Sequence, residues 1–243
     1  MEKKQPVILT KVLNSWPALN LWNDLAYLKS KAVGRLVPVE TVAKEDASIS
    51  FLSKTWSHEV MPLNDYIDQY FAQDDGNGKD TPHGYLAQHP LLDQIPSLRD
   101  DIRIPPFCYK PLISAWFGPT GTVSPLHNDP YQNVLAQIVG RKYLRIYDAC
   151  HTDHLYPHIS HLGHNSSIDL ENPNHKKYPL FSQTPSWQTI LQPGDLLYIP
   201  RHAWHYVRSL ETSFSASFWF GAKMELVKDS DGIYKGKYVC KDE

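Results

Sequence analysis

The chain has 243 residues, of which 42% are hydrophobic and 21% charged, and its net charge is −2 with the histidines neutral. These proportions are typical of a globular protein, and they argue against broad binding to nucleic-acid phosphates, which needs clustered lysine and arginine. No apolar run has the length of a membrane span, and the first residues lack the apolar segment of a signal peptide. Cys108, Cys150 and Cys240 are widely spaced and form neither a disulfide framework nor a zinc module, which favours a reducing compartment. We therefore expect a cytoplasmic or nuclear protein with no membrane partner.

Helical patterns are confined to the first third of the chain. Five apolar residues recur at helical spacing after Pro62, namely Leu63, Tyr66, Ile67, Tyr70 and Phe71. A weaker helical pattern covers residues 20–30, and the polar stretch 72–80 is typical of a loop.

Short strands dominate from residue 112 onward. They are expected near 112–117, 122–127, 132–139, 142–147, 188–192, 195–199, 204–209 and 213–220, with turns at Gly140 and at residues 192–195. Many short strands favour a sandwich, jelly roll or barrel, and the early helices make the whole mainly β, of the α+β type, with helices packed outside. We expect one domain over residues 1–243, with a core at about 6–220 and a polar tail at 221–243.

The strand at 213–220 has two different faces. Phe214, Ala216, Phe218 and Phe220 alternate with three serines and Trp219. Serines on an exposed edge strand would face solvent. Because Trp219 shares their face, we interpret this face as the wall of a cavity that the small serine side chains leave open.

His127 and Asp129 stand two apart in a polar stretch, so a strand would turn both to one face. A bare pair of this kind is most often a surface turn. A later histidine would complete a metal site of two imidazoles and one carboxylate. Such a set suits non-haem Fe(II), which keeps three open positions for oxygen chemistry, although zinc hydrolases use similar ligands. His205 and His202 compete for the third place.

Five further histidines recur between residues 151 and 164: His151, His154, His158, His161 and His164. On a helix this spacing would suggest a metal-binding stripe. Pro157 interrupts such a helix, and no acid or cysteine completes a site, so we predict a histidine-rich surface loop.

Several longer motifs resemble the JmjC-domain family of 2-oxoglutarate-dependent oxygenases. They are "PVILTKVLNSWPALNLW", "GYLAQH", "AWFGPTGTVSPLHNDPYQNVLAQIVGRKYLRIY", "PGDLLYIP" and "WHYV", and the resemblance runs from Pro6 to Phe220. "GYLAQHPLLDQIPSL" and "HNSSIDLENP" are similar to the branch of jumonji domain-containing protein 5. The resemblance implies a double-stranded β-helix, a cupin-like jelly roll, that uses Fe(II), 2-oxoglutarate and dioxygen.

The resemblance also implies roles for single residues. "WHYV" makes His205 the third iron ligand beside His127 and Asp129. The residues implied for 2-oxoglutarate are Tyr85, Ser124, Asn133, Lys142 and Trp219. Lys142 shares a strand face with Leu144 and Ile146, so its ammonium would need an anionic partner if it pointed inward. The strand pattern alone would favour a solvated lysine.

For the substrate, the resemblance implies an arginine-binding acid at Glu40, with Trp56, Gln88 and Trp116 as its companions. A carboxylate pairs with a guanidinium in a plane, and indole faces stack on the cation. Without the resemblance, Glu40 would be a surface acid at a strand end and Trp56 a core residue.

The expected function is therefore hydroxylation of arginine side chains in a protein or peptide substrate. Demethylation of histone methyl-lysine is the alternative within the family, and a non-catalytic cupin-type binding module is the alternative outside enzymes. Family members usually carry a sizeable region before the catalytic domain, so both a catalytic fragment and a compact natural version remain open.

Overall fold

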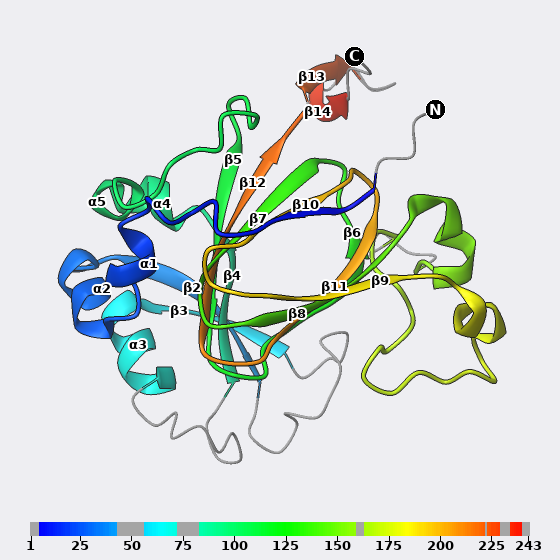
Figure 1. Cartoon of the computed structure of the whole chain (residues 1–243), viewed down its shortest axis with the longest axis horizontal. Coiled ribbons are helices and arrows are strands. Elements are labelled where there is room, and N and C mark those ends of the chain that lie inside the picture. Colours follow the sequence, from blue (N-terminus) through cyan, green and yellow to red (C-terminus); the bar gives the residue numbers. More distant parts are fainter. Residues whose placement is uncertain are drawn as a thin grey trace.

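Two antiparallel sheets face each other across the interior of the molecule (Figure 1). The computed structural model describes residues 5–42, 56–71, 83–158, 163–221, 223–228 and 234–239. The larger sheet has the order β1 (Val7–Leu9), β10 (Leu196–Ile199), β7 (Gln132–Val139), β12 (Ser213–Phe220), β5 (Leu112–Gly118), β4 (His83–His89), β2 (Leu36–Val42) and β3 (Trp56–Pro62). The smaller sheet has the order β6 (Val123–Asn128), β11 (Trp204–Ser209), β8 (Lys142–Tyr147) and β9 (Trp187–Leu191).

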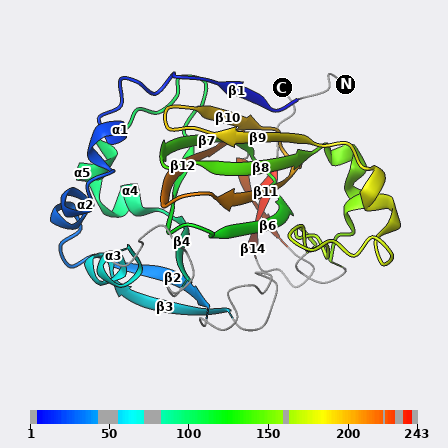
Figure 2. The same cartoon turned by 60° about the horizontal axis from the view of Figure 1, so that its bottom comes forward.

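Helices cover the side of the larger sheet that faces away from the smaller one (Figures 1 and 2). They are α1 (Ala18–Leu21), α2 (Leu25–Lys31), α3 (Leu63–Phe71), α4 (Leu91–Gln94) and α5 (Pro96–Arg99). Two 3-10 helices, η2 (Ala149–Leu155) and η3 (Pro179–Gln183), lie in the connection between β8 and β9, and β13 (Lys223–Lys228) pairs with β14 (Tyr234–Val239). The mainly β jelly-roll core with flanking helices that the sequence predicts is confirmed.

A column of aromatic rings joins the helices to the larger sheet. Trp22 packs on Phe214 with ring centroids 4.3 Å apart, Phe214 stacks on Phe117 at 4.8 Å, and Phe117 stacks on Phe71 at 4.4 Å. Ring contacts of this geometry stabilise the fold beyond the contribution of the apolar area that the rings bury. The helical face predicted after Pro62 is buried in this layer, as expected.

The other face of β12 is the interior face. Ser213, Ser215 and Ser217 are fully buried, and Ser217 lines the chamber between the sheets. The indole nitrogen of Trp116 donates to Ser217 Oγ at 2.9 Å, and Ser215 donates to Gln137 at 2.7 Å. The solvent-facing alternative for these serines is wrong. The cavity-wall interpretation is confirmed for Ser217 and Trp219, whereas Ser213 and Ser215 are hydrogen-bonded in the interior.

The eight strands predicted from residue 112 onward agree with the structure to within one residue at each end. For strands β1, β2, β3 and β4, which all lie before residue 90, the sequence analysis gave no bounds, and it expected only a strand end at Glu40. In β2, Pro38 interrupts the pattern, since proline is rare inside sheets. The predicted helix at 20–30 is wrong in extent: α1 ends at Leu21 and α2 begins at Leu25, because the Asp24 side chain accepts from the Ala26 amide and caps a new helix.

Three further expectations concern segments outside the core. The loop predicted at 72–80 lies outside the described residues. The expected polar tail contains the strands β13 and β14. No helix among the described residues is both long and apolar enough to cross a membrane.

Candidate metal and co-substrate site

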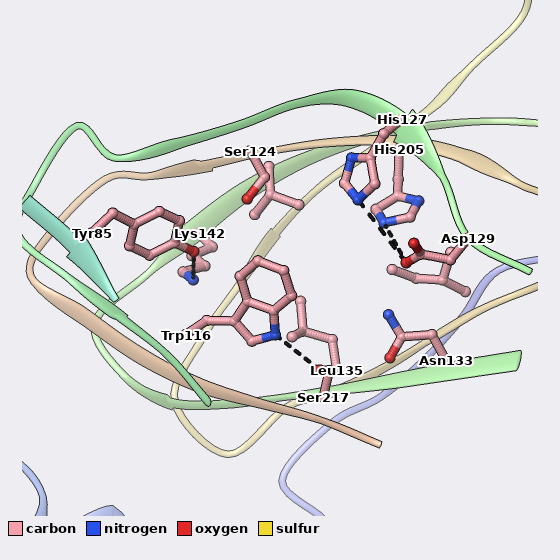
Figure 3. Close-up of a pocket in the computed structure, with 12 residues that line it drawn as sticks. Tyr85, Trp116, Ser124, His127, Asp129, Asn133, Leu135, Lys142, His205 and Ser217 are labelled. Carbon is pink, nitrogen blue, oxygen red and sulfur yellow. Dashed lines mark hydrogen bonds and ion pairs between the residues drawn. The ribbon is translucent and has the colours of Figure 1, made fainter. Parts of the chain in front are cut away.

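Strand pairing brings His127, Asp129 and His205 together. His127 on β6 lies directly opposite His205 on β11, and Asp129 follows just after the end of β6. Asp129 Oδ2 lies 3.7 Å from His205 Nε2 and 4.0 Å from His127 Nε2 (Figure 3). One ligand atom from each of the three residues falls within 4.8 Å of the others. A single metal ion can contact all three.

Both imidazoles are oriented by a backbone carbonyl. His127 Nδ1 lies 2.7 Å from the oxygen of Pro125, and His205 Nδ1 lies 3.0 Å from the oxygen of Ala203. A carbonyl only accepts, so each Nδ1 carries the proton and each Nε2 keeps its lone pair for a metal. Burial, with the nearby His127, lowers the pKa of His205 to about 4. The neutral imidazole that a metal requires is therefore the stable form.

His202, the rival third ligand, is not part of this group. Its side chain is exposed, and its backbone N–H donates to the carbonyl oxygen of Asp129 at 2.9 Å. The structure thus gathers His205 with the HxD pair and leaves His202 at the opening. Two imidazoles and one carboxylate fit Fe(II) with three positions left for other ligands, and they also fit zinc.

The histidine-rich segment contains no second cluster of metal ligands among its described residues. His151 and His154 lie on the short helix η2 with ring centroids 5.7 Å apart, and His164 is exposed. His161 lies outside the described residues. The predicted surface loop is therefore partly helical.

An inner chamber leads from the three ligands to Lys142 (Figure 3). Lys142 is only 2% exposed, so the solvated lysine favoured by the strand pattern is wrong. Its ammonium donates to the Tyr85 hydroxyl at 3.3 Å, and among the described residues no carboxylate forms an ion pair with it. Burial lowers the pKa of Lys142 to about 7. A buried amine without a counterion marks a place for an anion.

Two further polar atoms, one lining the inner chamber and one lining the outer chamber that adjoins it, also lack partners among the described residues. Asn133 Oδ1 and Trp219 Nε1 are both buried and make no hydrogen bond with any described residue. The two residues lie directly opposite each other on β7 and β12, and Trp219 stacks on Tyr131 with centroids 5.3 Å apart. Ser124 shares a hydrogen bond with Tyr85. Buried groups of this kind normally bind protein, water or a ligand.

These observations fit a dicarboxylate such as 2-oxoglutarate. The chamber offers a cation and a hydroxyl at one end and the three metal ligands at the other. All five residues that the sequence resemblance implies for the co-substrate, Tyr85, Ser124, Asn133, Lys142 and Trp219, line this chamber or the outer one that adjoins it.

The outer chamber opens to solvent and shares Tyr85, Trp116, Ser124 and two metal-ligand residues with the inner one. Its empty volume, including the space open to solvent, is about 1570 Å³ against about 360 Å³ for the inner chamber. The larger volume can accept a side chain of a macromolecular substrate.

Three of the four predicted substrate residues line the outer chamber: Glu40, Gln88 and Trp116. Glu40 lies within β2, opposite Tyr85 on β4, so it is not at a strand end. Its Oε2 atom is buried without a hydrogen-bond partner among the described residues, and burial raises the pKa of Glu40 to about 7. Trp56 begins β3, but its side chain is outside the described part of the structure.

The outer chamber also contains residues that sequence reasoning did not assign to a site. They include Leu112, Asn128, Tyr131, Asn165 and the exposed His164. Asn128 and Tyr131 could have been found from their place beside the HxD pair. Asn165 stands in the quoted motif "HNSSIDLENP", but its place at the chamber follows from its pairing with His127, which the sequence does not show.

Fold and site together define a jelly-roll protein of the cupin class. A model of the "cupin-like domain" family matches residues 1–225. Lysine-specific demethylase 8 of Danio rerio is 46% identical over 90% of this chain and 54% of its own length. Jumonji C domain-containing protein 5 of Drosophila melanogaster is 40% identical over 90% of this chain and 55% of its own length.

The chain belongs to the cupin-like JmjC family of oxygenases. It spans about half the length of the curated relatives that it matches. The solved structure of E. coli ycfD covers 95% of this chain with a TM-score of 0.50 and 18% identity, a similarity of fold alone.

Proposed function

We propose that the chain is an Fe(II)- and 2-oxoglutarate-dependent oxygenase that hydroxylates arginine side chains of a protein substrate. The observation that carries the proposal is the pairing of two features in one chamber. The buried ammonium of Lys142, which has no carboxylate partner among the described residues, lies at one end, and the three metal ligands lie at the other.

In this proposal His127, Asp129 and His205 hold Fe(II). When bound, iron, dioxygen and 2-oxoglutarate together supply an oxidation in which 2-oxoglutarate becomes succinate and carbon dioxide and one oxygen atom enters a substrate C–H bond. The side chains control where this happens. Lys142 and Tyr85 would hold the far carboxylate of 2-oxoglutarate. The co-substrate would be surrounded by Ser124, Asn133 and Trp219, which line the two adjoining chambers.

The preference for arginine rests on Glu40. Its half-buried carboxylate lines the outer chamber, and its Oε2 atom has no hydrogen-bond partner in the described part of the chain, so it can bind a cation there. A guanidinium can pair with it in a plane, and the indole of Trp116 can pack along the stem. Holding the guanidinium at a fixed anion would leave a stem carbon beside the metal, and the oxidation acts on the carbon that is held nearest.

Demethylation of methyl-lysine is the second candidate, and the names of several relatives favour it. It begins with the same oxidation, on an N-methyl carbon, followed by loss of formaldehyde. It requires the methyl group at the metal with the nitrogen immediately behind it. Glu40 can also attract that cation, so the identity of the modified residue must decide between the two.

The experiment that tests the oxygenase itself measures succinate formed from 2-oxoglutarate under Fe(II), ascorbate and oxygen. We expect turnover by the wild type, stimulation by arginine-containing peptides, and loss of turnover in Asp129→Ala. No turnover by the wild type would instead support a non-catalytic binding module of the cupin type.

A further inference from the structure

We infer that His202 is a substrate-positioning residue that hydrogen-bonds the main chain of the peptide beside the modified side chain. The inference rests on the proposed function, because it assigns a role within the same substrate chamber. His202 is neither a metal ligand nor a core residue: its imidazole is exposed and lines the outer chamber.

The backbone of His202 adopts a conformation that favours glycine. The Ala203 amide donates to the Pro200 carbonyl at 3.0 Å, which closes a β-turn, and His202 at the third position has φ = 63°. Turns with positive φ at this position usually carry glycine or asparagine. A residue with a Cβ costs about 1–2 kcal/mol in this region. The turn itself does not require an imidazole at this position, and an observed outlier of this kind points to a use for the side chain.

A second strained residue lies on the same chamber. Among the described residues, five other than glycine have positive φ, and two of them, Gln88 and His202, line the outer chamber. Gln88 lies where the pairing of β4 with β5 shifts register. Strained residues collect where a ligand requires a particular side-chain position. Gln88 and His202 thus both have a strained backbone at the rim of the chamber, and we interpret this strain as the cost of directing their side chains toward a ligand.

The chemistry of the rim fits a peptide main chain. Among the described residues, the exposed ones that line the chamber are Gln88, Leu112, His164 and His202, none of which carries a permanent charge, and the described lining has no lysine or arginine. A neutral imidazole both donates and accepts, as a peptide amide requires. The charges of the chamber lie deeper, at Glu40 and Asp129.

The turn also links the rim to the metal site. The backbone N–H of His202 donates to the Asp129 carbonyl, so the backbone from which the imidazole projects is held next to a metal ligand. A peptide bound by His202 would therefore be placed in register with the metal. Because this bond comes from the backbone, substitutions of the side chain leave it in place.

The test measures the affinity of peptides with a central arginine and alanine–glycine flanks, so that only the main chain offers contacts beside the arginine. Each flanking amide is N-methylated in turn. For the wild type we expect one methylated position to weaken binding about three- to tenfold, the value of one hydrogen bond. In His202→Gly that penalty should vanish, and the unmethylated peptide should bind about as weakly as the methylated peptide binds to the wild type.

Thermal unfolding separates this role from a structural one. His202→Gly should leave the unfolding midpoint unchanged or higher, because glycine relieves the strained φ. Lys110→Gly is the matched control, since Lys110 is exposed, has φ = 44° and lies outside the chamber. It should show the same change of midpoint with peptide affinity unaltered.

Two results would overturn the inference while leaving the proposed function intact. They are an equal N-methyl penalty in the wild type and His202→Gly, or a lowered unfolding midpoint in His202→Gly alone. A wild type that binds none of the arginine peptides would overturn the proposed function, and this inference with it.

Discussion

Lys142 and Tyr85 meet in the interior of the jelly roll, where the lysine ammonium donates to the phenol oxygen at 3.3 Å. The two residues come from opposite sheets, β8 and β4, and they close the end of the chamber that lies away from the metal ligands (Figure 3). A buried cation whose described partner is a neutral hydroxyl is unfavourable for the empty protein. An anionic co-substrate would remove this cost.

This arrangement predicts opposite effects of Lys142→Met on stability and on turnover. The unfolding free energy of the protein without co-substrate should rise by about 1–4 kcal/mol at pH 7, because an uncompensated buried amine is replaced by an apolar chain. Turnover of 2-oxoglutarate should be lost. Lys110→Met, at an exposed position, is the control for both measurements. A less stable Lys142→Met would show that the ammonium has a structural role.

The pH dependence of stability should report the burial of Glu40. Its pKa is raised by burial from 4.5 to about 7, so between these values the folded state binds a proton that the unfolded state has released. The stability that Glu40 contributes is thus fully present below about pH 4.5 and is lost as the pH rises through 7. Denaturant unfolding of wild type and Glu40→Gln should differ in slope over this interval. If the unfolding free energies of wild type and Glu40→Gln changed in parallel with pH, the Glu40 carboxylate would be exposed to solvent and the account of its burial would be wrong.

Glu40→Gln should reduce peptide hydroxylation far more than it reduces turnover of 2-oxoglutarate without peptide. The variant keeps the shape of the side chain but loses the charged pair with a guanidinium, which is worth about 2–4 kcal/mol when buried. Peptide KM and kcat, measured beside succinate release, check this result. Glu211→Gln, which removes an exposed acid paired with Arg141, should leave both activities unchanged. Equal hydroxylation by Glu40→Gln and wild type would remove Glu40 from the substrate site.

Metal affinity should separate the two neighbouring histidines. His205→Ala should weaken Fe(II) binding by more than about 100-fold, since even supporting residues of a metal site contribute 10- to 100-fold. His202→Ala should retain wild-type metal affinity, because the bond to the Asp129 carbonyl comes from its backbone. Calorimetric titration without oxygen measures both. The reverse order of effects would exchange the roles of the two residues.

The strands of the core could be predicted because their sequence patterns are local. The alternation of serine and phenylalanine in 213–220 shows which residues share a face, and Gly140 marks a turn. The early strand β2 carries Pro38 and gave no such pattern, and its strand geometry depends on pairing with β3 and β4. Pairing between strands that are distant in the sequence is a tertiary feature, so no short stretch of sequence reveals it.

The candidate site shows the same division. The spacing of His127 and Asp129 follows from the strand period. The choice of His205 over His202 came from the resemblance of "WHYV", and the pairing of β11 with β6, which places His205 opposite His127, agrees with it. The burial of Glu40 arises from its position opposite Tyr85, so the sequence alone suggested a surface acid. The strained turn at His202 carries no glycine or asparagine, and its sequence therefore did not reveal the positive φ.

The most direct test of the central claim is mass spectrometry of a peptide library incubated with the protein, Fe(II), 2-oxoglutarate and oxygen. The library contains arginine peptides and methyl-lysine peptides in equal amounts, and Asp129→Ala serves as the inactive control. We predict the gain of one oxygen atom on arginine with matching succinate release, and no change of the methyl-lysine peptides. Clean loss of a methyl group from lysine, with arginine unmodified, would contradict the account.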